Sequence, residues 1–113
     1  MINVMVVEVA IAANTTNDNV LTGKRFERAP FDCYLKLASS GSAAGLQEEL
    51  NVGGRAVTPR NPVNTNNRIP VEPDDNAVDG VPVREGELIQ LSAANGTAGA
   101  LTYRARVTLT RAR

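Results

Sequence analysis

Hydrophobic and polar residues alternate without interruption near the C-terminus, over residues 101–111. The odd positions are apolar and the even positions polar: Leu101, Tyr103, Ala105, Val107 and Leu109 against Thr102, Arg104, Arg106, Thr108 and Thr110. A strand sends successive side chains to opposite faces, whereas a helix would scatter both sets around its circumference. The pattern therefore predicts a strand on an antiparallel sheet, with one face in a core and the other in water.

A second alternating run covers residues 31–37, and its apolar face is expected to point inward. That face consists of Phe31, Cys33, Leu35 and Leu37. Pro30 suits the start of a strand, where a missing amide does least harm. The polar run 39–42 is expected to end the strand.

The N-terminal residues 3–12 alternate loosely and are apolar on both faces. One face carries Met5, Val7, Val9 and Ile11, and the other carries Val4, Val6, Glu8 and Ala10. A strand with two apolar faces belongs either in the centre of a sheet or under a neighbouring subunit. The polar cluster 14–19 then predicts a turn, and a short strand is expected near Val20–Thr22.

Residues 42–52 fit two structures. Ser42 could cap a short helix whose face carries Leu46 and Leu50, or the segment could be a strand with alternate residues on one face. We favour the strand, running on to Val57, because one or two isolated turns of helix are weak. Gly53-Gly54 would then mark a bulge or kink.

Residues 58–82 are rich in proline and asparagine, and no strand longer than Ile69–Glu72 is expected there. Long irregular segments in small domains are usually functional or disordered. Interspersed apolar residues favour an ordered loop docked on a surface: Val63, Ile69, Val71, Val78 and Val81.

The last third of the chain predicts a hairpin. Arg84–Glu87 is expected to form a turn and Leu88–Leu91 to belong to a strand. Asn95-Gly96 is a hairpin signal leading into residues 101–111, with a longer loop or a bulge near Gly99. The whole pattern predicts an all-β protein, an antiparallel β-sandwich of jelly-roll type with about seven to eight short strands and little helix. We expect one domain covering residues 1–113.

Composition narrows the function. The chain has 12 acidic and 12 basic residues and therefore no net charge. General nucleic-acid binders rely on a positive electrostatic field, so this balance argues against that class of protein. Most of the bases are arginine, a residue suited to protein interfaces. The apolar N-terminus lacks a basic leader and is interrupted by Glu8, so we expect neither a signal peptide nor a membrane span, and a protein made in a cytoplasm.

Candidate chemistry is sparse. The chain has no histidine and one cysteine, Cys33, which argues against a zinc site, an internal disulfide and a neutral-pH catalytic base. The adjacent pair Glu48-Glu49 would point apart in a strand. The acidic run 72–80 could offer oxygens to Ca²⁺, but its spacing does not fit a regular calcium loop. We therefore predict no enzyme, no catalytic residue, no cofactor and no metal.

The arrangement of residues 31–113 resembles that of the small β-sandwich decoration, or cement, proteins of bacteriophage capsids. The resemblance is carried by the strand 31–37, the segment Leu50-Asn51-Val52-Gly53-Gly54-Arg55-Ala56-Val57, the loop Arg68-Ile69-Pro70-Val71-Glu72-Pro73-Asp74-Asp75, and the closing segments 86–92, 95–97 and 101–109. It implies a virion protein that forms homotrimers or other symmetric oligomers, binds the major capsid protein at capsomer junctions and holds the shell against internal pressure. It implies no direct contact with nucleic acid or membrane.

Subunit and shell contacts are expected in residues 1–12 and in the loop 58–82. The predicted contact residues are Met5, Val7, Val9, Arg55, Arg60, Arg68, Asp74 and Asp75. Deleting residues 1–12 is expected to abolish assembly while leaving the closing hairpin folded. The alternatives are an adhesion or receptor-binding module of a viral fibre or spike, and a small coat protein.

Overall fold

The computed structural model describes residues 2–72 and 74–112 and confirms the all-β class. Eight strands and no helix occur in these residues. The strands are β1 (Ile2–Ile11), β2 (Thr15–Asn17), β3 (Cys33–Gly41), β4 (Leu46–Val52), β5 (Arg55–Pro62), β6 (Asn76–Val83), β7 (Ile89–Asn95) and β8 (Leu101–Arg111).

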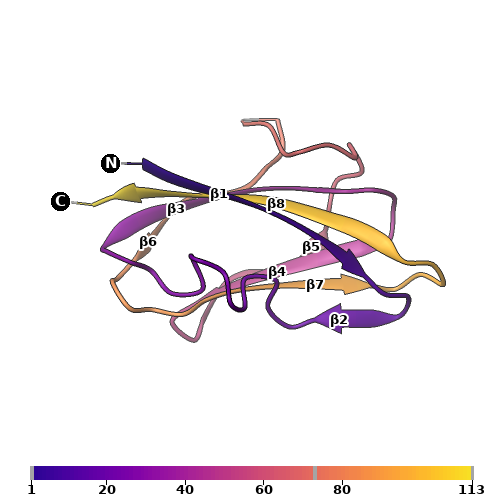
Figure 1. The fold of residues 1–113 in the computed structure, drawn as a ribbon, viewed down its shortest axis with the longest axis horizontal. Helices are drawn as coiled ribbons and strands as arrows, with labels where there is room; N and C mark the ends of the chain where they lie inside the picture. The colour runs from indigo at the N-terminus through magenta and orange to yellow at the C-terminus, as the bar shows by residue number, and fades with distance from the viewer. Residues whose placement is uncertain (1, 73, 113) are drawn as a thin grey trace.

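The strands pair as one long hairpin that has been rolled up. β1 pairs with β8, β2 with β7, β3 with β6 and β4 with β5, all antiparallel. Rolling then brings β8 beside β3 and β7 beside β4. The result is a first sheet in the order β1-β8-β3-β6, packed on a second sheet in the order β2-β7-β4-β5 (Figure 1). This order is that of a jelly roll.

The core lies between the two sheets, and β8 supplies its centre. The predicted inward residues Tyr103, Ala105, Val107 and Leu109 are all buried, which confirms the alternation. They face buried leucines, isoleucine and valine from β4 and β7: Leu46, Leu50, Val52, Ile89 and Leu91. Each such aliphatic side chain contributes about 1.5–3 kcal/mol by leaving water. The even face is only partly exposed, because β8 lies between β1 and β3.

Strand β3 confirms its predicted inward face but not its predicted end. Phe31, Cys33, Leu35 and Leu37 are buried. The strand continues to Gly41 through the polar run that was expected to end it, since Ser39 and Ser40 pair with β8. Serine is tolerated there because the Ser39 hydroxyl finds a buried acceptor, described below.

The strand interpretation of residues 42–52 is confirmed, but the strand does not run on to Val57. Leu46, Glu48, Leu50 and Val52 share the buried face of β4. Gly53 and Gly54 form a tight turn rather than a bulge, with φ of 57° and 80°. Two consecutive positive φ values suit a two-residue hairpin loop, and glycine adopts them without steric cost.

The prediction that residues 58–82 are irregular is wrong at both ends of that range. β5 and β6 occupy the two ends, and the 63–75 loop lies between them. The prolines of these strands, Pro59, Pro62 and Pro82, lie in the edge strands β5 and β6, where a residue without an N–H can be tolerated. These two strands were not predicted from the sequence because proline is rare in strands other than edge strands, and a proline-rich segment therefore looks irregular.

Two further predictions are corrected by pairing. The short strand of the N-terminal third is Thr15–Asn17, and Val20–Thr22 is instead a turn whose Val20 and Leu21 enter the core. Asn95-Gly96 does not make a hairpin, because β7 and β8 belong to different sheets. Residues 96–100 therefore cross from one layer to the other.

Candidate functional site

The exposed large hydrophobic side chains of the described residues gather on one side of the sandwich. They are Val4, Val6, Tyr34, Ile69 and Val71. The first three lie on the outer face of the first sheet, and the last two lie in the 63–75 loop, which rises above that sheet (Figure 1). We call this set the apolar side. The outer face of the second sheet carries polar residues such as Thr16, Gln47 and Arg60.

The structure places the predicted contact residues of β1 on its inward face. Val7 is 3 % exposed, and Met5 and Val9 pack against the core beside it. The outward residues are Val4 and Val6, at 37 % and 47 % exposed. β1 is an edge strand, so the expectation of a central position is wrong, and coverage by a neighbouring subunit stays a prediction.

The structure predicts that removing residues 1–12 would disrupt the rest of the fold. β1 pairs with β8 over its whole length and supplies Val7 and Ile11 to the core. The closing hairpin that was expected to survive does not exist. Contacts of β1 must therefore be tested with point substitutions.

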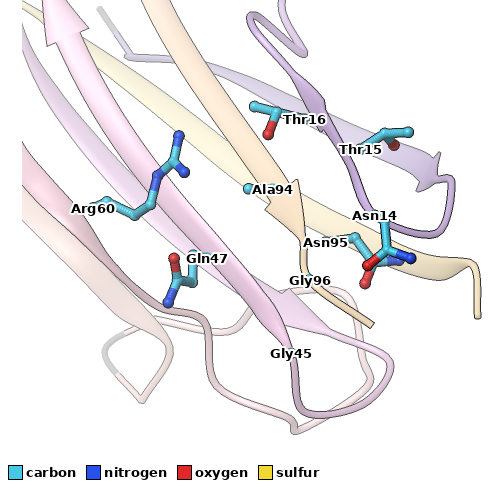
Figure 2. Close-up of a pocket in the computed structure, with 9 residues that line it drawn as sticks. All are labelled: Asn14, Thr15, Thr16, Gly45, Gln47, Arg60, Ala94, Asn95 and Gly96. Atoms are coloured by element: carbon cyan, nitrogen blue, oxygen red, sulfur yellow. The ribbon is translucent and has the colours of Figure 1, made fainter. Parts of the chain in front are cut away.

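Arg55 and Arg60 lie in different surroundings. Arg55 follows the Gly53-Gly54 turn, contacts Glu87 at 3.4 Å between Nη2 and Oε1, and keeps a side chain that is 59 % exposed. Arg60 projects from β5 over a hollow of about 330 Å³ on the outer face of the second sheet. Figure 2 shows Arg60 and Gln47 on one side of this hollow, Thr16 on the other and the small Ala94 between them. The structure does not bring either arginine onto the apolar side.

Arg68, Asp74 and Asp75 are brought together in the 63–75 loop, but Asp75 is not available for contacts. Its side chain is fully buried and accepts hydrogen bonds from Arg68 Nε and Nη2 at 3.0 and 3.2 Å. Asn66 Nδ2 and the Val71 main-chain N–H also donate to it, at 2.6 and 2.9 Å. The hydrogen bonds from Arg68, followed by those from Val71 and Asn66, hold the pKa of Asp75 below its usual value despite burial.

Asp75 therefore holds the 63–75 loop together from inside, and other residues form the outer surface of the loop. Ile69 and Val71 are 57 % and 43 % exposed, whereas Val63 and Val78 are buried. The prediction of a docked loop holds for its ends and is wrong for its tip. Asp74 is exposed and lies 4.0 Å from Arg68 Nη2, the limit of an ion pair.

A buried carboxylate, that of Glu48, connects the two sheets by hydrogen bonds, and this role was not predicted from the sequence. Glu48 of β4 is 4 % exposed. Its Oε2 accepts a hydrogen bond from Ser39 Oγ at 2.8 Å, and its Oε1 accepts one from Tyr103 Oη at 2.7 Å. Ser39 and Tyr103 belong to the first sheet. The signal was present, because Glu48 is a charged residue within the apolar face of an alternating run.

Burial raises the pKa of Glu48, and the hydrogen bonds from Tyr103 and Ser39 oppose that rise only in part. Burial, followed by the neighbouring charge of Glu48, also raises the pKa of Tyr103 well above its usual value. Both Glu48 oxygens are engaged with the opposite sheet. The network is therefore suited to fixing how the sheets pack rather than to reacting with a substrate.

Replacing Glu48 with glutamine should remove one source of pH dependence. Because the folded state raises the pKa of Glu48, this group contributes stability that is complete below its usual pKa and is lost as pH rises through the raised value. The free energy of unfolding of Glu48→Gln, measured by chemical denaturation, should increase relative to that of the wild type as pH rises from 4.5, the usual glutamate pKa, through the raised value. A constant difference across that range would contradict the assignment.

Among residues 2–72 and 74–112, no three acidic, histidine or cysteine side chains form a group that could hold a metal ion. No helix in this part of the chain is long and apolar enough to cross a membrane. The fold defines the protein as a jelly-roll β-sandwich with one apolar side. No protein-family model, curated protein or solved structure matches the chain.

Proposed function

We propose that this protein is a structural virion protein, a capsid decoration or cement protein that binds a shell at the junctions between capsomers. The observation that carries the proposal is the one-sided placement of the exposed hydrophobic residues. Val4, Val6 and Tyr34 on the first sheet and Ile69 and Val71 above it form the apolar side. Apolar groups gathered on one surface and rimmed by polar residues are typical of protein–protein contacts.

Two features of the outer face suit a protein contact rather than a solvated surface. Arg104 pairs with Glu8 at 3.6 Å and donates to Asn67 at 2.8 Å, so this arginine is fixed between β1 and the 63–75 loop. Lys36 pairs with Asp79 at 3.6 Å across β3 and β6. With their charges already paired, these side chains can meet an apolar or neutral partner at lower desolvation cost than free charges.

The jelly-roll order adds support by analogy, because this architecture recurs in viral capsid proteins and in lectins. In the proposed arrangement the apolar side faces the major capsid protein. The polar outer face of the second sheet faces the surrounding solution. The protein is located in the virion and acts as a homo-oligomer.

Rebinding to virus particles tests this arrangement. Particles that lack the protein are mixed with the purified wild type or with variants, then sedimented and heated. Wild type should co-sediment to saturation and raise the temperature at which the particles release their genome. Tyr34→Lys, on the apolar side, should lose both effects, because it brings a charge into the contact.

Gln47→Lys is the matched control, since it adds the same charge on the outer face of the second sheet. This variant should bind and protect particles as the wild type does. The proposal is wrong if the wild type does not bind particles, or if Gln47→Lys abolishes binding and Tyr34→Lys does not.

A second candidate function, a receptor-binding module, is favoured by the hollow shown in Figure 2. Arg60 makes no ion pair with the residues that the structure describes, and Gln47 and Thr16 add amide and hydroxyl groups around the same space. These groups could hold a sugar carboxylate. Titration with N-acetylneuraminic acid should then show saturable binding that Arg60→Ala abolishes.

A further inference from the structure

We propose that the free edge of β1 binds the same edge of a second copy of this chain, antiparallel and about a two-fold axis. The two first sheets would join into one continuous sheet. This inference does not depend on the proposed function. It starts from the differences among the four sheet edges.

Three of the four edges carry features that prevent strand addition. β2 has only three residues. β5 contains Pro59 and Pro62 and shifts register against β4, and β6 contains Gly80 and Pro82 and shifts register against β3. Short strands, prolines and bulges are the means by which proteins block edge pairing. β1 differs from all of them.

β1 is long and regular, and it lacks glycine and proline. It pairs with β8 in unbroken register from Ile2↔Thr110 to Ile11↔Leu101. Its outward side chains next to the edge include the exposed Val4 and Val6 rather than a lysine. A long, regular edge with exposed valines is a template for pairing with another strand.

The direction of the main-chain groups identifies which residues would pair. Arg25 Nη2 donates to the Val4 carbonyl oxygen at 3.0 Å, so that carbonyl points away from β8. In an antiparallel strand the N–H and C=O of one residue point to the same edge, and successive residues point to opposite edges. Val4, Val6, Glu8 and Ala10 therefore direct their main-chain groups to the free edge. Arg25 is exposed and can turn into solvent when a strand arrives.

With one open edge on each subunit, strand addition gives a closed oligomer only when two copies pair through the same edge. A cyclic trimer built by strand pairing needs two different open edges on each subunit, whereas a two-fold dimer needs one edge that matches itself. Among the four edges of the described sheets, β1 is the one that is longer than three residues and has no proline, glycine or register shift. The occupant that the edges favour is therefore a second copy, and the oligomer is a dimer.

A register centred on Met5 matches the side chains best. It places Val4 opposite Val6 of the second copy, twice, on the common outer face. A register centred on Val6 places Glu8 opposite Val4, and one centred on Val7 places Glu8 opposite Val6, so neither keeps both valine–valine pairs. Met5 of one copy then faces Met5 of the other across a non-hydrogen-bonded pair, where Cα atoms lie about 4.5 Å apart.

The first test is the mass of the full-length protein by light scattering behind a sizing column. Wild type should have twice the 12.0 kDa of the chain at micromolar concentration and above. Val6→Pro removes an N–H that points to the free edge and no bond to β8, so it should give a folded monomer. Val6→Thr keeps that N–H and should remain a dimer.

A cysteine cross-link tests the register and does not depend on how Val6→Pro folds. Met5→Cys should form a disulfide-linked dimer in air, because its opposite cysteine lies within bonding range. Val9→Cys, on the same face of the strand, should not, and the native Cys33 is buried. The proposal is overturned by a monomeric wild type, by a folded Val6→Pro dimer, or by cross-linking of Val9→Cys but not of Met5→Cys. Failure of the particle-rebinding test would leave these results unaffected, because that test changes Tyr34 and Gln47.

Discussion

Replacing Tyr103 with alanine should lower the free energy of unfolding by about 4 kcal/mol, the largest single effect that we expect. Tyr103 is fully buried in the central strand β8, between the two sheets. Its removal opens a cavity that the flanking strands cannot fill, and Glu48 loses one of its two hydrogen-bond donors. Chemical denaturation at neutral pH measures the change.

Tyr103→Phe separates the contribution of the aromatic ring to stability from that of the hydroxyl group. This variant keeps the packing and removes only the donor to Glu48, so it should cost about 1–3 kcal/mol. Its cost should shrink at acidic pH, where Glu48 is protonated and accepts weaker hydrogen bonds. If the alanine and phenylalanine variants lost the same stability, the packing contribution assigned to the ring would be wrong.

Replacing Asp75 with alanine should cost about 2 kcal/mol and open the 63–75 loop. The carboxylate is the shared acceptor of Arg68, Asn66 and the Val71 main chain. We place the cost below that of a fully buried ion pair because the Arg68 side chain is 44 % exposed and can be solvated again. Stability is measured by chemical denaturation, and loop opening by faster proteolysis within residues 63–75.

Asp74→Ala is the matched control, because Asp74 is 71 % exposed and only reaches Arg68 at 4.0 Å. It should change stability by less than about 0.5 kcal/mol. Asp75 also has a pH signature. The folded state lowers the pKa of Asp75, so Asp75 stabilises the fold at pH values above the usual aspartate pKa. This stabilisation is lost as pH falls through the lowered pKa, and the free energy of unfolding of Asp75→Ala should not show that decrease.

The fold class and most of the core were predictable from the sequence because alternation is a local property of the chain. A strand repeats every two residues whatever it pairs with, so the odd residues of 101–109 and of 31–37 could be assigned to the core directly. All of them are buried except Leu101, which is partly buried at the start of β8. The pattern of residues 42–52 fitted both a helix and a strand, and the strand was favoured because one or two isolated turns of helix are weak.

The candidate site was only partly predictable. The sequence singled out the N-terminal strand and the loop near residue 70, and both segments carry exposed residues of the apolar side. The individual residues were not, because the same alternation fits either face of β1. Only the fold shows that Val7 points inward while Val4 and Val6 point outward.

Strand pairing was decided by the tertiary structure alone. The sequence signal Asn95-Gly96 is typical of a hairpin, yet β8 pairs with β1 and β3, from distant parts of the chain. Hydrogen-bond ladders between strands have no local signature, so the alternation of a strand does not identify its partners. The same holds for Glu48, whose donors come from β3 and β8, because a buried polar network exists only once the two sheets have packed.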